Sequence, residues 1–306
     1  MANKLLVVIG GPTGIGKTDL AIRLALHYHT EIISADSRQV YKELIIGVGR
    51  PTDQQLQEVP HHLIGTISIH EPFSAADFAE KALGIINSLF TQHDIVIMTG
   101  GTGMYMQSVM EGLDDIPPVP DEVLARWQQF WEQNGTEALA EKLLDMDPAY
   151  YAVVDRANPR RLLRAISVCD ATGQPFSSFL NKPKTQRPFH CLQFALELPR
   201  EVLYGKVNQR VLHMMDMGLA EEARSLFPFR QLKALDTVGY KELFEWLDGK
   251  MTLDQAVAMI QQSTRRYAKR QMTWFRNRGD WNMVAPDADT LIIEEIERVL
   301  YEIKEV

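Results

Sequence analysis

A run of eight residues near the amino end of the chain has the spacing of a phosphate-binding loop. It reads Gly11-Pro12-Thr13-Gly14-Ile15-Gly16-Lys17-Thr18 and matches the pattern G-x-x-x-x-G-K-[ST]. In such a loop the glycines let successive backbone N–H groups point inward, the lysine reaches the terminal phosphates, and the Thr18 hydroxyl can bind Mg²⁺. The sequence therefore predicts that these residues bind a diphosphate or triphosphate together with Mg²⁺.

Two further groups of residues with chemical potential follow short apolar runs. Asp36 comes directly after the run 31–35, and a glycine-rich segment, Gly100–Tyr105, follows the run 95–99. Because ligands bind at the carboxyl ends of parallel strands, Asp36 is expected in the crevice of the phosphate loop. There its carboxylate can move a proton, assist the metal or cap a helix. The run 95–99 lacks the terminal Asp with which an ATPase of this type holds Mg²⁺, and this disfavours nucleotide hydrolysis.

Basic residues gather in two stretches without acidic residues, although the net charge of the chain is −8. One stretch holds Arg160, Arg161 and Arg164, and the other is the segment Arg265–Arg270. Each is either a solvated helix face or a contact for a polyanion. We expect one or two of the arginines in the second stretch to face the phosphate crevice and the others to face a larger polyanion.

Short apolar runs alternate with helical patterns over the first hundred residues, which is typical of strand-helix-strand units on a parallel sheet. A proline-rich segment, 114–120, interrupts this pattern, and only helical periodicity follows up to about residue 181. The segment 189–198 then reads as a strand that returns to the sheet. The sequence thus predicts an α/β fold, with a P-loop core formed by residues 1–118 and 187–306 and a helical insertion domain at 119–186. The helices expected in the insertion include 122–134, 136–146 and 159–172.

Composition limits the remaining possibilities. The chain has 306 residues, of which 45% are hydrophobic, and its apolar runs are too short to cross a membrane. Its amino end lacks the pattern of a secretory signal, so a cytoplasmic protein without a membrane partner is expected, with a monomer as the default. Neither the two cysteines nor the pair His61-His62 has the spacing of a metal site.

Six segments, in this order, resemble the tRNA dimethylallyltransferase family, whose members modify an adenosine beside the anticodon. Apart from the phosphate loop each motif alone is weak, but together they span nearly the whole chain and are highly specific. They are Gly11–Thr18, Ser34–Ser37, Gly100–Tyr105, Asn158–Ala165, Val238–Tyr240 and Thr264–Gln271.

The resemblance implies a reaction and a set of catalytic residues. Members transfer a dimethylallyl group from dimethylallyl diphosphate to N6 of adenosine 37 in tRNAs that read codons beginning with U. Asp36 would be the general base for the N6 proton, and Thr102 would contact the target nucleotide or the diphosphate. Gly11–Thr18 and Arg265 would bind the diphosphate, although the sequence alone leaves open which arginine of 265–270 does so.

The resemblance also implies that the anticodon stem-loop of tRNA is a partner. The helical insertion would bind the anticodon stem, and Ser37 and Gln39 would line the base pocket. The implied tRNA contacts are Asp36, Ser37, Arg38, Gln39, Thr102, Arg126, Arg160, Arg161, Leu162, Leu163, Arg164, Asp236, Thr237, Val238, Gly239, Tyr240 and Lys241.

Three other functions share some of these features. A P-loop kinase of a small metabolite would have the same phosphate loop, and a relative could prenylate a free adenine nucleotide in place of tRNA. A nucleotide-regulated RNA-binding protein without enzymatic activity is also compatible with the motifs. The helical insertion, with its arginines, favours a macromolecular substrate over the first two.

Overall fold

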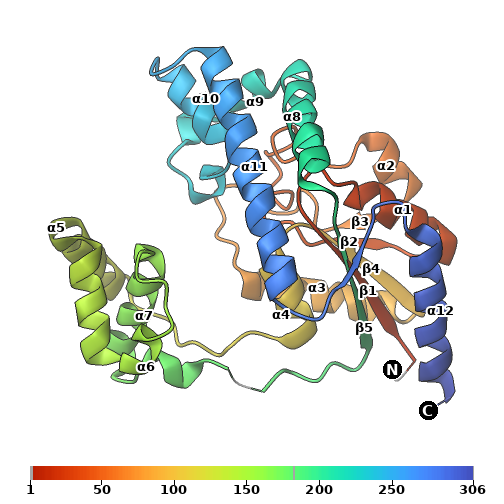
Figure 1. Ribbon diagram of the computed structural model, residues 1–306, viewed down its shortest axis with the longest axis horizontal. Coiled ribbons are helices and arrows are strands. Elements are labelled where there is room, and N and C mark those ends of the chain that lie inside the picture. Colours follow the sequence, from red (N-terminus) through yellow and green to blue (C-terminus); the bar gives the residue numbers. More distant parts are fainter. Residues whose placement is uncertain (1–2, 182, 306) are drawn as a thin grey trace. The chain divides into compact units, whose positions relative to one another are not determined.

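The structure is a computed structural model that describes residues 3–181 and 183–305 (Figure 1). Over these residues it contains a sheet of six strands in the order β3-β2-β4-β1-β5-β6, and every pair of neighbours is parallel. The predicted α/β class with a parallel sheet is confirmed. The strands are β1 (Leu5–Gly10), β2 (Ile32–Ser34), β3 (His61–His62), β4 (Ile95–Thr99), β5 (His190–Leu196) and β6 (Asn282–Val284).

The central strand β1 is buried on both faces because nearly all of its residues are apolar. Alternate side chains of a strand point to opposite faces, so Leu5, Val7 and Ile9 join one hydrophobic cluster and Leu6 and Val8 join another. The first cluster includes buried residues of α1 (Lys17–Tyr28) and α12 (Asp289–Glu305), and the second includes those of α3 (Ala75–Leu89) and α4 (Gly103–Glu111). Helices therefore cover both faces of the sheet.

Further helices extend this body beyond the sheet. They form a third hydrophobic cluster with residues 40–44, in which Tyr240 and Leu243 are fully buried. These elements are α8 (Arg200–Asp216), α9 (Leu219–Leu226), α10 (Tyr240–Leu247) and α11 (Leu253–Asn277), with the 3₁₀ turns η2 (Phe227–Phe229) and η3 (Lys233–Leu235). The short helix α2 (Asp53–Glu58) has no buried residue and contributes nothing to this cluster.

The chain forms two compact units. The core unit comprises the residues up to Gly112 and those from Gln186 onwards, and the helical unit comprises Leu113–Thr185. The helical unit contains α5 (Asp121–Met146), α6 (Pro148–Tyr151), α7 (Pro159–Thr172) and the 3₁₀ turn η1 (Phe176–Phe179). The assignment of residues 119–186 as a tRNA-binding domain stays a prediction.

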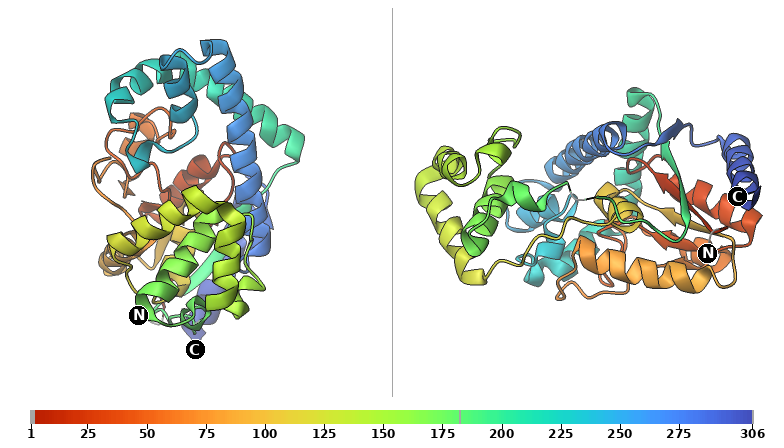
Figure 2. Two further views of the ribbon diagram at one scale, coloured as in Figure 1. Left: turned by 90° about the vertical axis from the view of Figure 1, so that its left-hand side faces the viewer. Right: turned by 90° about the horizontal axis from the view of Figure 1, so that it is seen from below.

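The helical unit has its own hydrophobic core, in which α5 and α7 pack side by side (Figure 2). Leu162, Ala165, Ile166 and Cys169 of α7 are buried there, and their spacing of three or four residues is that of one helix face. Gly135 interrupts α5 with a positive φ of 80°, so its two parts correspond to the two helices expected at 122–134 and 136–146. Both apolar periodicity and a glycine break were therefore readable in the sequence.

Two edge strands escaped the sequence interpretation. The strand β3 is only two residues long and consists of histidines, and β6 has three residues, of which Val284 alone is buried. Neither is long enough to show an alternating pattern. Each forms because a neighbouring strand supplies the backbone partners, β2 for the first and β5 for the second.

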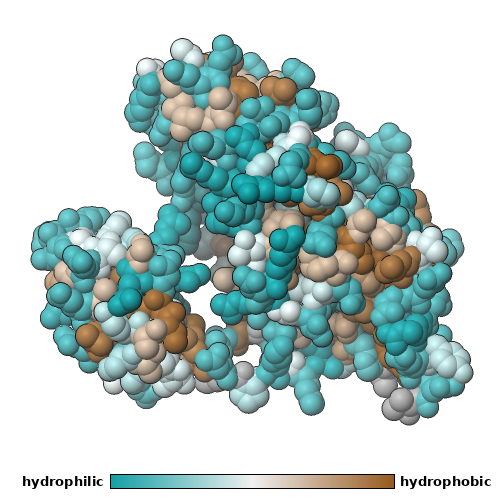
Figure 3. All heavy atoms as spheres, viewed as in Figure 1, coloured by the Kyte–Doolittle hydropathy of each residue, from teal (hydrophilic) through white to brown (hydrophobic). Residues whose placement is uncertain are grey.

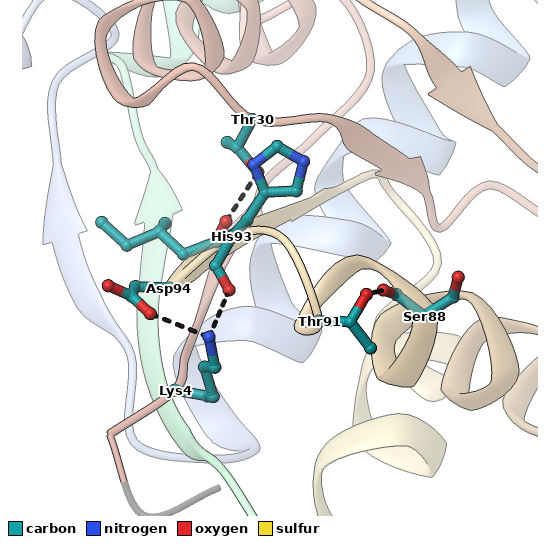
Figure 4. A network of polar contacts seen from close by, with 7 residues as sticks. Lys4, Thr30, Ser88, Thr91, His93 and Asp94 are labelled. Carbon is teal, nitrogen blue, oxygen red and sulfur yellow. Dashed lines mark hydrogen bonds and ion pairs between the residues drawn. The ribbon is translucent and has the colours of Figure 1, made fainter.

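Side-chain hydrogen bonds hold the amino ends of the strands together (Figure 4). Just before β1, Lys4 Nζ donates to the His93 carbonyl at 2.9 Å and pairs with Asp94 Oδ1 at 2.8 Å. Thr30 Oγ1 donates to the Ile95 carbonyl at 2.6 Å. These bonds lie at the amino ends of the strands, on the side of the sheet opposite to the phosphate loop. They stabilise the fold and leave the carboxyl ends of the strands for ligands.

Hydrophilic residues cover most of the face seen in Figure 3, and hydrophobic side chains reach this surface in small groups. Across the described residues, the helices are all too short or too polar to serve as a membrane span.

Candidate active site

The predicted phosphate loop lies between the end of β1 and the start of α1. Gly11, Gly14 and Gly16 have φ values of 146°, 76° and 109°, a conformation that favours glycine. Lys17 and Thr18 are the first two residues of α1. The first N–H groups of a helix have no partner within the helix, so these backbone donors and the helix dipole favour an anion at this point.

The surroundings of Lys17 lower its pKa, as is expected for a buried cation at an anion-binding site. Its Nζ donates to the Pro12 carbonyl at 2.8 Å, within the phosphate loop. Desolvation of the ammonium lowers the pKa of Lys17 to about 7; the Asp36 carboxylate opposes this shift and the Arg210 guanidinium adds to it. A bound anion would supply the missing negative charge, so the loop is electrostatically prepared for phosphate oxygens.

Arg210 on α8 is a second cation near the loop, and the sequence analysis missed it. Its Cδ lies 3.9 Å from the place where a Cβ on Gly14 would be, and its Nη2 donates to the Gly49 carbonyl at 3.4 Å. Desolvation lowers the pKa of Arg210, and the carboxylates of Asp36 and Asp19 oppose that shift. No local motif marks Arg210, because it reaches the loop through the packing of α8, on which Val207 also lies beside Gly14.

Asp36 lies in a turn after β2 that is held by its own carboxylate. Its Oδ1 accepts the backbone N–H of Arg38 at 2.8 Å and that of Gln39 at 3.2 Å. No hydrogen bond to Oδ2 occurs among the described residues. Ser37 donates its backbone N–H to Thr102 Oγ1 at 3.0 Å, so the structure brings the two predicted catalytic residues, Asp36 and Thr102, to adjacent turns.

Gly100 allows these turns to approach each other. A Cβ at this position would lie only 2.1 Å from the Ala35 carbonyl oxygen, so any other residue would force the segments apart. The Thr102 N–H also donates to the Ala35 carbonyl, at 3.2 Å. The second glycine-rich turn thus has a packing reason that the sequence analysis left unspecified.

Arg38 and Gln39 use their side chains on neighbouring backbone. Arg38 donates to the carbonyls of Ala234 at 3.0 Å and Asp236 at 3.2 Å, which fixes the start of the predicted segment 236–241. Gln39 Nε2 donates to the Gly49 carbonyl at 3.0 Å. Both residues therefore shape the surroundings of Asp36.

Other predicted contacts are placed less simply. Asp236 and Lys241 form an ion pair, and Thr237 and Val238 are half-buried. Gly239 and Tyr240 are buried; the Tyr240 hydroxyl donates to Glu222 Oε1 at 2.5 Å. The Tyr240 side chain packs in the core unit, where it offers no surface to an RNA.

The basic stretch of α11 divides between two surroundings. Arg265 Nη1 donates to Asn208 Oδ1 on α8 at 2.6 Å. A surface pocket of about 360 Å³ is lined by Arg266, Lys269, Arg270 and Thr273. The structure thus separates Arg265 from the other basic residues of this stretch.

The helical unit exposes the predicted arginines. Arg160, Arg161 and Arg164 are exposed at the start of α7, which Asn158 caps by accepting the Arg161 N–H at 3.3 Å. Leu162 is fully buried, so its side chain is part of the core and not of the arginine surface, while Leu163 is half-buried. Arg126 on α5 pairs with Asp170 on α7.

Histidine ligands for a metal are not assembled. His61 Nδ1 lies 2.8 Å from the Val59 carbonyl, and His62 Nε2 lies 2.5 Å from Glu31 Oε2. Over the part of the chain that the structure describes, no group of three or more His, Cys, Asp or Glu side chains is arranged to hold a metal ion. A metal ion at the phosphate loop would therefore need most of its ligands from a substrate and from water.

A family model described as IPP transferase matches residues 39–278. The chain belongs to the IPP transferase family. The matched range begins after the phosphate loop and Asp36. The prediction of an enzyme related to tRNA dimethylallyltransferases is confirmed.

Similar proteins of the IPP transferase family carry names that agree with this assignment. The chain is 45% identical to tRNA dimethylallyltransferase 1 of Bacteroides thetaiotaomicron, over 94% of each chain. It is 48% identical to a tRNA dimethylallyltransferase of Christiangramia forsetii, over 90% of this chain and 91% of the relative.

Solved structures of the family have the same fold. A full-length tRNA isopentenylpyrophosphate transferase of Bacillus halodurans is 33% identical and superposes with a TM-score of 0.71, over 99% of this chain and 97% of the other. A eukaryotic dimethylallyltransferase described as acting on tRNA is 26% identical, with a TM-score of 0.78 over 94% and 76% of the two chains.

Proposed function

We propose that this IPP transferase moves a dimethylallyl group from dimethylallyl diphosphate to N6 of adenosine 37, in tRNAs that read codons beginning with U. The observation that carries the proposal is that two features lie together at the carboxyl ends of the strands of one sheet. One is the phosphate loop with Lys17 and Arg210, and the other is the turn in which Asp36 is held beside Thr102.

The phosphate loop would bind the leaving group. When the bond between the dimethylallyl carbon and the diphosphate oxygen breaks, its electron pair goes to the diphosphate. Loop amides, the Lys17 ammonium and the Arg210 guanidinium would stabilise the developing charge, in a site where desolvation strengthens electrostatic interactions. Arg265 remains a candidate through its place on α11, although its guanidinium binds Asn208.

The residues present fit Mg²⁺ as the accompanying ion. Thr18 presents a half-buried hydroxyl at the start of α1, and its side chain makes no hydrogen bond within the described residues. Mg²⁺ commonly takes few protein ligands and completes its shell with phosphate oxygens and water, which suits a site without a carboxylate cluster. When bound, the ion would supply further charge neutralisation of the diphosphate.

The turn at Asp36 would act on the acceptor. As N6 of the adenine attacks the dimethylallyl carbon, its proton would pass to Asp36 Oδ2, the oxygen that the turn does not use. Thr102 would hold the turn through Ser37 and contact the nucleotide or diphosphate. A base within a stacked anticodon loop must first be extruded to reach such a site, at a cost of a few kcal/mol.

The helical unit would bind the anticodon stem. Its exposed arginines at the start of α7 have the charge needed for phosphate contacts, and α7 is held firmly by its buried face. We propose Arg160, Arg161 and Arg164 as the principal contacts. The cytoplasmic location and the monomeric state stay predictions.

The residue at the end of β4 disfavours a kinase function. This residue is Thr99, whose hydroxyl donates to the Ile9 carbonyl at 3.1 Å and which provides no carboxylate for Mg²⁺.

The functional test incubates the protein with labelled dimethylallyl diphosphate and undermodified tRNA, with AMP and ATP in parallel. Label in tRNA supports the proposal; label in AMP or phosphate release from ATP would replace it with one of the other enzymes.

Binding of dimethylallyl diphosphate at pH 8 is expected to take up a proton. The unliganded pKa of Lys17 is about 7, so the group is mostly neutral at that pH, and the diphosphate stabilises its charged form. Affinity should therefore fall as the pH rises above 7, by up to about 10-fold per pH unit. Calorimetry in buffers of different ionisation enthalpy measures the uptake. In Lys17→Arg the side chain stays charged, and uptake equal to that of the wild type would contradict this account.

Arg164→Ala is expected to raise the KM for tRNA and to make it less dependent on salt. Loss of one phosphate contact lowers the slope of log affinity against log salt by about 1. The matched control is Lys142→Ala, because Lys142 is an exposed cation on α5 of the same unit. If both variants keep the wild-type slope, Arg164 does not contact the RNA backbone.

A further inference from the structure

Gln271 on α11 joins the two halves of the candidate site. Its Oε1 accepts the backbone N–H of Thr13 at 2.9 Å, and its Nε2 donates to the Gly101 carbonyl at 2.9 Å. Thr13 belongs to the phosphate loop, and Gly101 directly precedes Thr102. Gln271 is 6% exposed; its bond to Gly101 is buried and its bond to Thr13 is partly buried.

Glycines at the carboxyl edge of the sheet let α11 come close enough for these bonds. A Cβ on Gly101 would lie 2.2 Å from Gln271 Nε2, and a Cβ on Gly103 would lie 2.2 Å from the ring of Trp274. A Cβ on Gly10 would lie 2.3 Å from the ring of Phe275. The position of Gln271 is therefore set by direct packing of α11 on backbone, on both sides of the hydrogen bonds.

The bond to Gln271 reduces the number of backbone N–H donors that the phosphate loop can present to an anion. The Thr13 N–H is already used, so the loop amides available to an anion are those after it. On the other side, the bond to Gly101 restrains the turn whose Thr102 Oγ1 accepts the Ser37 N–H beside Asp36. One side chain thus restrains both the loop for the leaving group and the turn that carries the base.

We propose that Gln271 is a positioning residue that sets the distance between the diphosphate and the attacking nitrogen. The inference rests on the proposed prenyl transfer and deepens it. Transfer requires the carbon to lie between its two partners, and a misplacement of about 1 Å can cost about 10²-fold in rate. The amide supplies one acceptor for Thr13 and one donor for Gly101 in this shape, which neither an apolar side chain nor an ionised carboxylate can do.

A glutamate in place of Gln271 tests the donor directly. Ionised, Gln271→Glu presents only acceptors, and one faces the Gly101 carbonyl; protonated, it restores the same two bonds. A carboxyl group buried beside a carbonyl holds its proton more tightly than in water. The kcat of Gln271→Glu, divided by that of the wild type, is therefore expected to rise at least 5-fold or so from about pH 8.5 to about pH 6.

Two variants complete the kinetic comparison. Gln271→Met keeps the length of the side chain without either bond, so its kcat should fall about 10- to 100-fold with no pH dependence relative to the wild type. Gln262→Glu is the control, because Gln262 is exposed on the same helix, and its ratio should stay near one. Lys17, Asp36 and Tyr267 are titratable groups of this region, and dividing by the wild-type rate at each pH removes their contribution.

A measurement without catalysis separates this inference from the proposed function. Hydrogen exchange of the Thr13 amide should be slow in the wild type and at least 10-fold or so faster in Gln271→Met, because the bond that protects it is lost. Unchanged exchange, or a Gln271→Glu rate ratio that does not vary with pH, would overturn the positioning role. An inactive wild type with a protected Thr13 amide would refute the prenyl-transfer proposal and with it the catalytic meaning of Gln271.

Discussion

Replacement of Asp36 by asparagine is expected to lower the kcat of prenyl transfer by about 10²- to 10⁴-fold, the usual contribution of a positioned general base. An asparagine Oδ1 can still accept the N–H groups of Arg38 and Gln39, so the turn should remain. The amide cannot take up the N6 proton. Single-turnover transfer to tRNA measures the rate, and displacement of dimethylallyl diphosphate measures binding, which should change by less than about 3-fold.

The pH of this experiment matters because Asp36 also acts on Lys17. Its carboxylate raises the pKa of Lys17, so the asparagine variant should have a more neutral lysine at a given pH. Measurements at about pH 6 favour the charged form of Lys17 in both proteins and so reduce this indirect effect. If diphosphate affinity then falls as far as kcat, Asp36 belongs to the anion or metal site and is not the base.

Replacement of Arg210 by methionine is expected to reduce kcat/KM by about 10²- to 10³-fold, the range found when one preorganised donor to a developing negative charge is removed. Methionine keeps much of the aliphatic volume beside Gly14 but removes the charge and the bond to Gly49. The variant should also bind dimethylallyl diphosphate more weakly. Steady-state kinetics and calorimetric titration measure the two effects.

Two comparisons give this second prediction its specificity. Lys206→Met removes an exposed cation from the same helix and should leave both quantities unchanged within about 2-fold. Arg210→Lys keeps the charge without the planar donor group and should fall between the wild type and the methionine variant. A fall in melting temperature with normal kinetics would instead assign Arg210 to the loop at Gly49.

The residues behind these predictions differ greatly in how well the sequence alone predicts their place in the site. The phosphate loop and the helix of Arg160 could be predicted because each is defined by neighbours in the chain. In the loop, glycines at fixed spacing permit positive φ values next to a helix start. In α7, Asn158, Pro159 and the apolar spacing determined the helix start and its exposed arginines.

Asp36 was an intermediate case. Its place after an apolar run predicted the edge of the sheet, because parallel strands end together. The sequence did not show that one carboxylate oxygen would be used by the turn, nor that Thr102 would hold the Ser37 N–H. Those details arise from the approach of two turns that Gly100 permits.

The sequence by itself thus determined the α/β class, the glycine-rich loop before α1 and the exposed arginines, since these follow from backbone conformation and from the period of strands and helices. Only the tertiary structure decided that Arg210 and Gln271 reach the phosphate loop, and that Leu162 and Tyr240 turn into hydrophobic cores. The physical reason is that such contacts depend on how whole helix faces pack against distant backbone. That packing is set by the fit of many side chains at once, and no local spacing in the chain encodes it.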